Sequence, residues 1–114
     1  IDLDVSGYRF RTRKSVLSIS PSFKNLLTRW EDCTDIQPDG SLYIDANPLT
    51  FRHLLDLMRR PSRFPLFWTK EGGFDYALYA NLEEEADFFL VESLRDWIRE
   101  GGYTKAIVTE TKLR

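Results

Sequence analysis

The sequence predicts an α+β domain in which a small β-sheet packs against a cluster of helices. Apolar and polar residues alternate over residues 1–13, and Leu42–Ile44 forms a second, shorter strand-like run. Elsewhere apolar residues recur three or four positions apart, which is the spacing of one face of a helix. The order is hairpin, helices, strand and helices, which indicates an α+β domain with the helices on one side of a small sheet.

Length and composition fit a single packed domain. The chain has 114 residues, of which 42% are hydrophobic and 14% aromatic. Its one Cys excludes an internal disulfide, and one Cys with one His excludes a Cys/His zinc cluster. No apolar run approaches the ~20 residues of a membrane span, and the first residues show no signal-peptide pattern. Because residue 1 is Ile, we expect a fragment of a longer protein. We also expect an intracellular protein, either cytoplasmic or nuclear.

The N-terminal residues predict a β-hairpin. Two alternating runs are joined by Ser6 and Gly7, a pair typical of a two-residue turn. The register set by this turn brings opposite charges together on one face and apolar residues together on the other. The predicted cross-strand pairs are Val5–Tyr8, Asp4–Arg9 and Asp2–Arg11.

Two helices are predicted around the short strand Leu42–Ile44. Ser20 and Pro21 are typical of a helix start, as are Asn47 and Pro48. The expected apolar stripes are Phe23, Leu26, Leu27 and Trp30 in the first helix, and Phe51, Leu54, Leu55 and Met58 in the second, which Pro61 ends.

The C-terminal half is predicted to be helical after an irregular segment over residues 62–70. We expect a short helix over residues 74–80, a third helix over Leu82–Leu90 and a fourth over Glu92–Glu100, closed by two glycines. Residues 104–114 are expected to form a strand or a tail.

No residue pattern predicts catalysis. His53 lies beside an apolar stripe without a marked partner carboxylate, and Cys33 lies in a polar loop. Glu83–Glu85 are consecutive and point around a helix, so a solvated N-terminal turn explains them better than a metal site. We therefore expect no enzyme, no cofactor and no metal.

Charge is distributed unevenly along the chain. Gly7–Trp30 holds six basic residues and no acidic one, Arg52–Arg63 holds four Arg against Asp56, and Leu82–Glu100 holds seven acids against two Arg. These blocks are either solvated faces that differ in sign, or the two sides of a domain that pairs head to tail with its own copies. Nucleic-acid binding is a weaker alternative, because the chain has a net charge of −2.

Several segments, in order, resemble the BTB/POZ fold and, within it, the potassium-channel tetramerisation (T1-like) branch, most closely BTB-domain proteins of fungi. The resemblance spans residues 3–101, which we take as the domain, with residues 102–114 as a C-terminal extension. The segments that carry it are Leu3–Thr12, Leu17 with Ser20–Phe23, Asp39–Asp45, the helix with Pro48, Phe51, Leu54, Leu55, Met58 and Arg59, and Leu82 with Glu85–Phe89 and Leu94.

The resemblance implies a small sheet packed against helices and a protein–protein interaction module. Domains of this branch self-associate into rings of four or five, and some family members are substrate adaptors for cullin-type ubiquitin ligases. The zinc-binding Cys/His set of some channel domains is missing, so any assembly would be zinc-free.

Two candidate surfaces follow from the charge blocks and the resemblance. The first is a self-association interface with a basic side (Arg9, Arg11, Arg13, Lys14, Arg29, Arg59 and Arg60) and an acidic side (Glu83, Glu84, Asp87 and Glu92). The second is a surface for a cullin scaffold (Glu31, Asp32, Asp35, Phe67, Trp68, Phe74 and Tyr76), although we expect most of the aromatic residues of this segment to complete the core instead.

Overall fold

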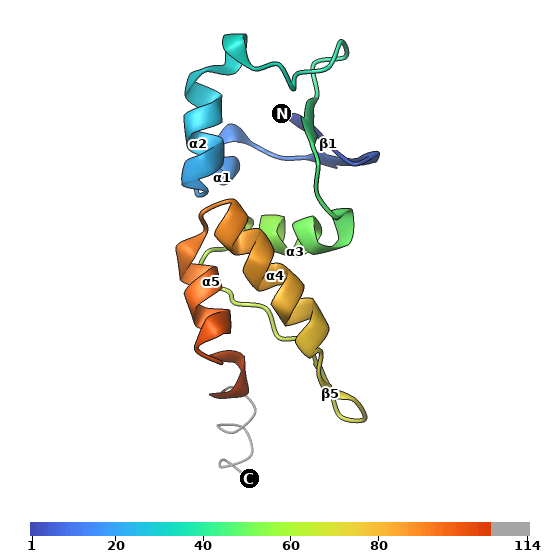
Figure 1. The fold of residues 1–114 in the computed structure, drawn as a ribbon, viewed down its shortest axis with the longest axis vertical. Helices are drawn as coiled ribbons and strands as arrows, with labels where there is room; N and C mark the ends of the chain where they lie inside the picture. Colours follow the sequence, from blue (N-terminus) through green and yellow to red (C-terminus); the bar gives the residue numbers. More distant parts are fainter. Residues whose placement is uncertain (106–114) are drawn as a thin grey trace.

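The computed structural model describes residues 1–105 and confirms the α+β architecture. The sheet with α1 and α2 forms one end of the molecule, α3 lies across the middle, and α4, α5 and a small hairpin form the other end (Figure 1). None of the described helices has the length and apolar character needed to cross a bilayer.

A three-stranded sheet is built on the predicted N-terminal hairpin. Strands β1 (Asp2–Val5) and β2 (Tyr8–Arg11) pair antiparallel in the predicted register, and β3 (Leu42–Ile44) joins β1 in parallel, giving the order β2-β1-β3. Ser6 and Gly7 both have positive φ, 49° and 97°, as a two-residue turn of this hand requires. The Ser6 hydroxyl donates to the Ala46 carbonyl at 2.8 Å, which ties the turn to the chain after β3.

The charged side chains of the hairpin follow the predicted pairing only in part. Arg11 lies 3.7 Å from Asp2 as expected. Arg9 instead pairs with Asp39 at 2.9 Å, and Asp4 accepts a hydrogen bond from Gln37 at 2.9 Å. The loop before β3 passes the hairpin and supplies these partners, a contact between segments that no local pattern could predict.

Capping residues begin the helices of the first half where the sequence placed them. Helix α2 (Pro21–Thr28) follows α1 (Lys14–Leu17) and is capped by Ser20, whose hydroxyl accepts from the Phe23 amide at 3.2 Å. A short 3₁₀ turn, η1 (Trp30–Asp32), comes next. Helix α3 (Pro48–Arg59) is capped by Asn47, whose side chain accepts from the Leu49 amide at 3.0 Å. The whole predicted stripe of α3 is buried, whereas in α2 only Phe23 is.

The second half differs from expectation at residues 68–88. Trp68–Thr69 (β4) and Gly73–Phe74 (β5) form a two-stranded hairpin, and one continuous helix, α4 (Tyr76–Phe88), replaces the two predicted helices. Asp75 caps α4 by accepting from the Leu78 amide at 3.0 Å, and no Gly or Pro interrupts the residues that follow. Phe74 is therefore a strand residue and not the start of a helix.

The chain after α4 turns sharply into α5 (Glu92–Arg99). Gly101 has a φ of 71°, and the Gly102 amide donates to the Trp97 carbonyl at 2.8 Å, so the two glycines close α5 as predicted. Tyr103–Lys105 are helical rather than extended, and the rest of the expected strand or tail lies outside the described residues.

The core joins the sheet to every long helix. Leu3 and Val5 of β1 are buried with the α3 stripe and with Leu82 and Leu94 of α4 and α5. The rings of Phe23 and Phe89 stack with centroids 4.8 Å apart. The Ser20 hydroxyl also donates to the Phe89 carbonyl, which ties the start of α2 to the end of α4.

Candidate interaction surfaces

The C-terminal end of α3 brings part of the predicted basic side together. The Arg59 Nη2 donates to the Arg11 carbonyl at 3.1 Å, and the Arg59 Nη1 lies 3.3 Å from the Asp56 carboxylate. Arg11, Arg59 and Arg60 thus share one region of the surface, although they lie in different sequence blocks.

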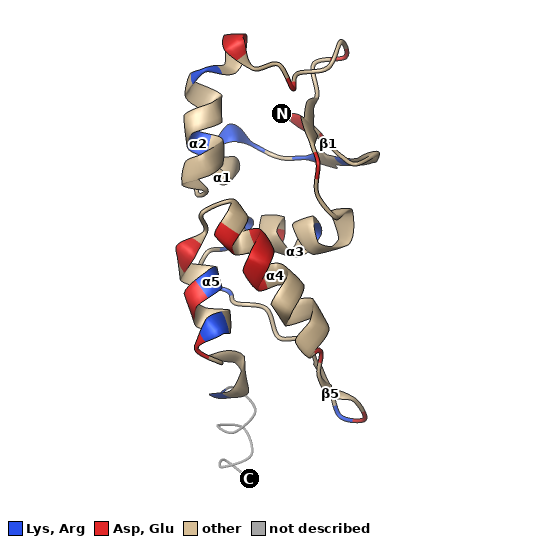
Figure 2. Cartoon of the chain, viewed as in Figure 1, with Lys and Arg blue, Asp and Glu red and all other residues tan. Residues whose placement is uncertain are grey.

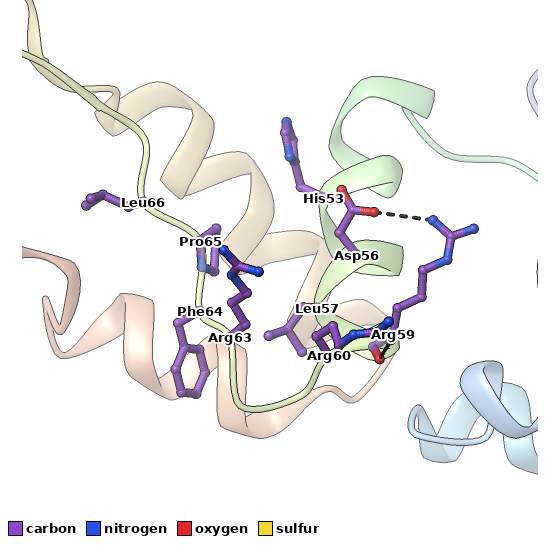
Figure 3. Close-up of a pocket in the computed structure, with 9 residues that line it drawn as sticks. All are labelled: His53, Asp56, Leu57, Arg59, Arg60, Arg63, Phe64, Pro65 and Leu66. Atoms are coloured by element: carbon purple, nitrogen blue, oxygen red, sulfur yellow. Dashed lines mark hydrogen bonds and ion pairs between the residues drawn. The ribbon is translucent and has the colours of Figure 1, made fainter.

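A groove of about 590 Å³ opens beside these residues (Figure 3). Arg63, which the predicted interface omitted, lines it with Arg59 and Arg60, and the Arg59 and Arg63 side chains lie on either side of Leu57. The charge count over Arg52–Arg63 already contained Arg63, and the groove brings it beside Arg59 and Arg60. We call this site the basic groove; its lining is His53, Asp56, Leu57, Arg59, Arg60, Arg63, Phe64, Pro65 and Leu66.

The other predicted basic residues lie elsewhere. Arg13 precedes α1, and the Lys14 ammonium lies over the Trp30 ring, 5.5 Å from its centroid. Arg29 ends α2 next to Trp30, so these residues belong to the end of the molecule that holds α1 and α2. Arg9 is held by Asp39, as described above. The predicted basic side is therefore not one continuous surface.

The acidic residues of α4 and α5 are partly neutralised within the chain. Asp and Glu gather on these two helices, with Arg95 and Arg99 among them (Figure 2). Arg95 lies 3.0 Å from both Asp87 and Asp96, and these carboxylates raise its pKa. Arg99 lies 3.5 Å from Glu83. Two of the four predicted acids, Glu83 and Asp87, thus have partners already.

A second hollow, of about 400 Å³, gathers carboxylates that the sequence did not group. Glu84 and Glu85 of α4 line it together with Asp45, which follows β3, and with Phe88. The glutamate triplet lies in the second half of α4, so its expected place in an N-terminal turn was wrong. Burial raises the pKa of Glu85. We call this site the acidic hollow; its lining is Asp45, Asn47, Thr50, Asn81, Glu84, Glu85 and Phe88.

The aromatic segment divides between core and surface. The Tyr79 hydroxyl, on a buried ring, donates to the Pro65 carbonyl and accepts from the Phe67 amide, both at 2.9 Å. Phe67 packs between His53 and Tyr79, and Phe74 packs on Tyr103. Trp68 and Tyr76 remain exposed.

The proposed scaffold-binding residues lie in two separate places. Glu31 and Asp32 are exposed on η1 and Asp35 in the loop that follows, at one end of the molecule. Trp68 and Tyr76 lie on and beside the β4–β5 hairpin at the opposite end (Figure 1). A single compact partner domain therefore cannot cover both sets through one small contact.

Within residues 1–105, no group of three or more His, Cys, Asp or Glu side chains is arranged to hold a metal ion. His53 makes an edge contact with the Phe67 ring, at a centroid distance of 4.7 Å. The features that stand out are surfaces of opposite charge rather than a reactive cluster.

Comparison with protein families identifies the family to which this architecture belongs. A family model described as BTB/POZ domain matches residues 1–97, and no curated protein matches the chain. The match covers the sheet, the basic groove, the acidic hollow and most of α5. The chain therefore belongs to the BTB/POZ family, in the potassium-channel tetramerisation branch, whose domains are non-catalytic interaction and oligomerisation modules.

Proposed function

We propose that this domain assembles with copies of itself, head to tail, into a zinc-free ring of four or five. The observation that carries the proposal is the separation of charge across α3. Arg59 and Arg60 end this helix in the basic groove, whereas Asn47 and Thr50 at its start line the acidic hollow.

Two local sites of opposite charge at different places on one chain favour a heterologous contact. Such a contact repeats from copy to copy and ends only when a ring closes. Exposed ion pairs contribute about 0–1 kcal/mol each, so several must act together, and salt must weaken them.

The first test is the mass in solution by light scattering, over a concentration series at low and high salt. We expect four or five times the 13.4 kDa of one chain at low salt and smaller species at high salt. A monomer at every concentration and salt would overturn self-assembly by this domain.

Charge reversal at the end of α3 tests the interface itself. Arg60→Glu is preferred to Arg59→Glu, because the Arg59 side chain also holds the Arg11 carbonyl and Asp56. We expect Arg60→Glu to lower the mass at low salt without changing the circular dichroism spectrum. Lys70→Glu, an exposed reversal near the β4–β5 turn, is the matched control and should leave the mass unchanged. An unchanged mass for Arg60→Glu would remove this region from the interface.

The unit that we propose to assemble spans residues 1–103, slightly more than residues 3–101. The Ile1 ammonium donates to the Thr12 carbonyl at 2.9 Å, and the Tyr103 ring stacks on Tyr79 with centroids 3.8 Å apart. Residues after 103 belong to the proposed C-terminal extension.

A second candidate function is an adaptor for a cullin-type scaffold. It is supported by exposed acidic residues on and after η1 and by exposed Trp68 and Tyr76. Pull-down with N-terminal cullin fragments tests it. Retention should fall for Asp32→Lys if the scaffold binds at η1, or for Trp68→Ala if it binds at the β4–β5 hairpin. No retention at micromolar concentration would count against this function.

A further inference from the structure

The turn from α4 to α5 presents two large apolar side chains to solvent. Phe88 is 72% exposed and Leu90 is 42% exposed. Leu90 also has a φ of 60°, a left-handed conformation that Gly or Asn adopts far more readily. Exposed aromatic residues on a strained turn are characteristic of contact sites rather than of stable surfaces.

Carboxylates that have no cationic partner among residues 1–105 line the hollow beside Phe88. Glu84 lies one helical turn before it, and Asp45 and Glu85 line the same hollow. Among residues 1–105, none of these three carboxylates has a hydrogen bond or an ion pair, whereas Glu83 and Asp87 on the same helix are satisfied by Arg99 and Arg95. The acidic hollow thus combines the projecting Phe88 side chain with negative charge that no cation neutralises within the described residues.

The basic groove has the complementary pair of properties. Its apolar walls are Leu57, Phe64, Pro65 and Leu66. The Phe64 ring stacks on the Trp97 ring, with the ring centroids 4.8 Å apart. Within the described residues the Arg63 side chain has no hydrogen bond or ion pair, so its charge is available to a partner. A groove of about 590 Å³ can take an aromatic side chain and the groups beside it.

We propose that Phe88 of one copy inserts into the basic groove of the next, while Arg60 and Arg63 of that groove reach the carboxylates of the first copy's acidic hollow. This inference rests on the proposed self-assembly and names the contact that produces it. The occupant of the groove is a second copy because the chain itself carries the matching apolar projection and the matching charge.

The positions of the two sites make the contact heterologous. The acidic hollow includes residues at the start of α3 and the basic groove includes residues at its end, and a helix of 12 residues separates such ends by about 18 Å. Each copy can therefore use its Phe88 on one neighbour and its groove on the other. This is the arrangement that closes a ring.

The experiment uses two variants that each disable one half of the contact. Phe88→Asp removes the projection and keeps the groove, and Arg60→Glu with Arg63→Glu reverses the groove and keeps the projection. We expect each variant alone to be monomeric, with association weakened at least about tenfold and an unchanged circular dichroism spectrum. Mixed in equal amounts, they should form a heterodimer of twice the 13.4 kDa chain mass and no larger species, because only one intact contact exists between them.

Tyr76→Asp is the matched control for Phe88→Asp. Tyr76 is 64% exposed and lies at the other end of α4, so this variant should assemble like the unaltered chain.

Each outcome decides the proposal. A monomeric unaltered chain would overturn the proposed self-assembly and this contact together. If the Phe88→Asp variant still assembles, this contact alone is overturned. The same holds if Tyr76→Asp dissociates the oligomer as much as Phe88→Asp does. Monomeric variants that fail to form the heterodimer on mixing would overturn the pairing of Phe88 with the groove. An acidic peptide that competes for the groove without affecting the ring would assign the groove to a different partner and overturn the second copy as its occupant.

Discussion

Leu90 shows how a single residue can disagree with its local structure. It occupies the left-handed position that ends α4, where the Val91 amide donates to the Ala86 carbonyl at 2.8 Å. A Leu in this conformation costs roughly 1–2 kcal/mol, which Gly or Asn avoids. The sequence carries no sign of this left-handed turn, because Gly or Asn usually marks such a position and this chain has Leu there.

We expect Leu90→Asn to raise the free energy of unfolding by about 0.5–1 kcal/mol, since the relief of strain exceeds the loss of a half-exposed side chain. Urea denaturation at low protein concentration measures this change without interference from assembly. The same variant should assemble more weakly if Leu90 flanks the contact made by Phe88. A clear loss of stability would show that the Leu90 side chain packs more than its exposure indicates.

At the scale of elements, helix α3 holds the fold together and positions both candidate sites. Its buried stripe contacts the sheet, α1 and α4, while its exposed side chains reach the basic groove. Phe51 is fully buried among three aromatic rings, namely Phe10, Phe23 and Phe89.

Phe51→Ala should therefore lower the free energy of unfolding by about 3–5 kcal/mol, the usual effect of emptying a buried aromatic site. Leu49→Ala is the control on the same helix, because Leu49 is 67% exposed, and we expect a change within about 0.5 kcal/mol. Thermal or urea unfolding compares the two. Equal losses in the free energy of unfolding would mean that the apolar stripe of α3 does not form the core.

Elements determined by neighbouring residues were predictable, and elements determined by distant contacts were not. The hairpin register and the caps at Ser20 and Asn47 depend on residues a few positions apart, and the structure confirms them. The β4–β5 hairpin is too short to show an alternating pattern, so its residues were assigned to a loop and a helix. The ion pair of Arg9 with Asp39 joins segments 30 residues apart and has no local signal.

At the scale of the whole molecule, blocks of charge along the sequence did not become faces. The basic residues divide between the groove at the end of α3 and the region of α1 and α2, and Arg95 and Arg99 neutralise part of the acidic block. The candidate site is therefore smaller than the sequence suggested and contains residues that charge counting could not select, chiefly Phe88 and Asp45.

The folded unit extends to Tyr103. Tyr103 stacks on Tyr79 and contacts Phe74 and Trp97, so it completes the aromatic packing at the end of the molecule opposite the sheet. A variant that ends after Gly101 loses this ring, and we expect it to unfold more easily by about 1–3 kcal/mol than a variant that ends after Lys105. Tyr103→Ala in the full chain should reproduce most of the loss, and Thr104→Ala, an exposed neighbour, should not. Equal melting temperatures for the two shortened chains would place the boundary at residue 101, and the stack of Tyr103 would then contribute nothing to the stability of the domain.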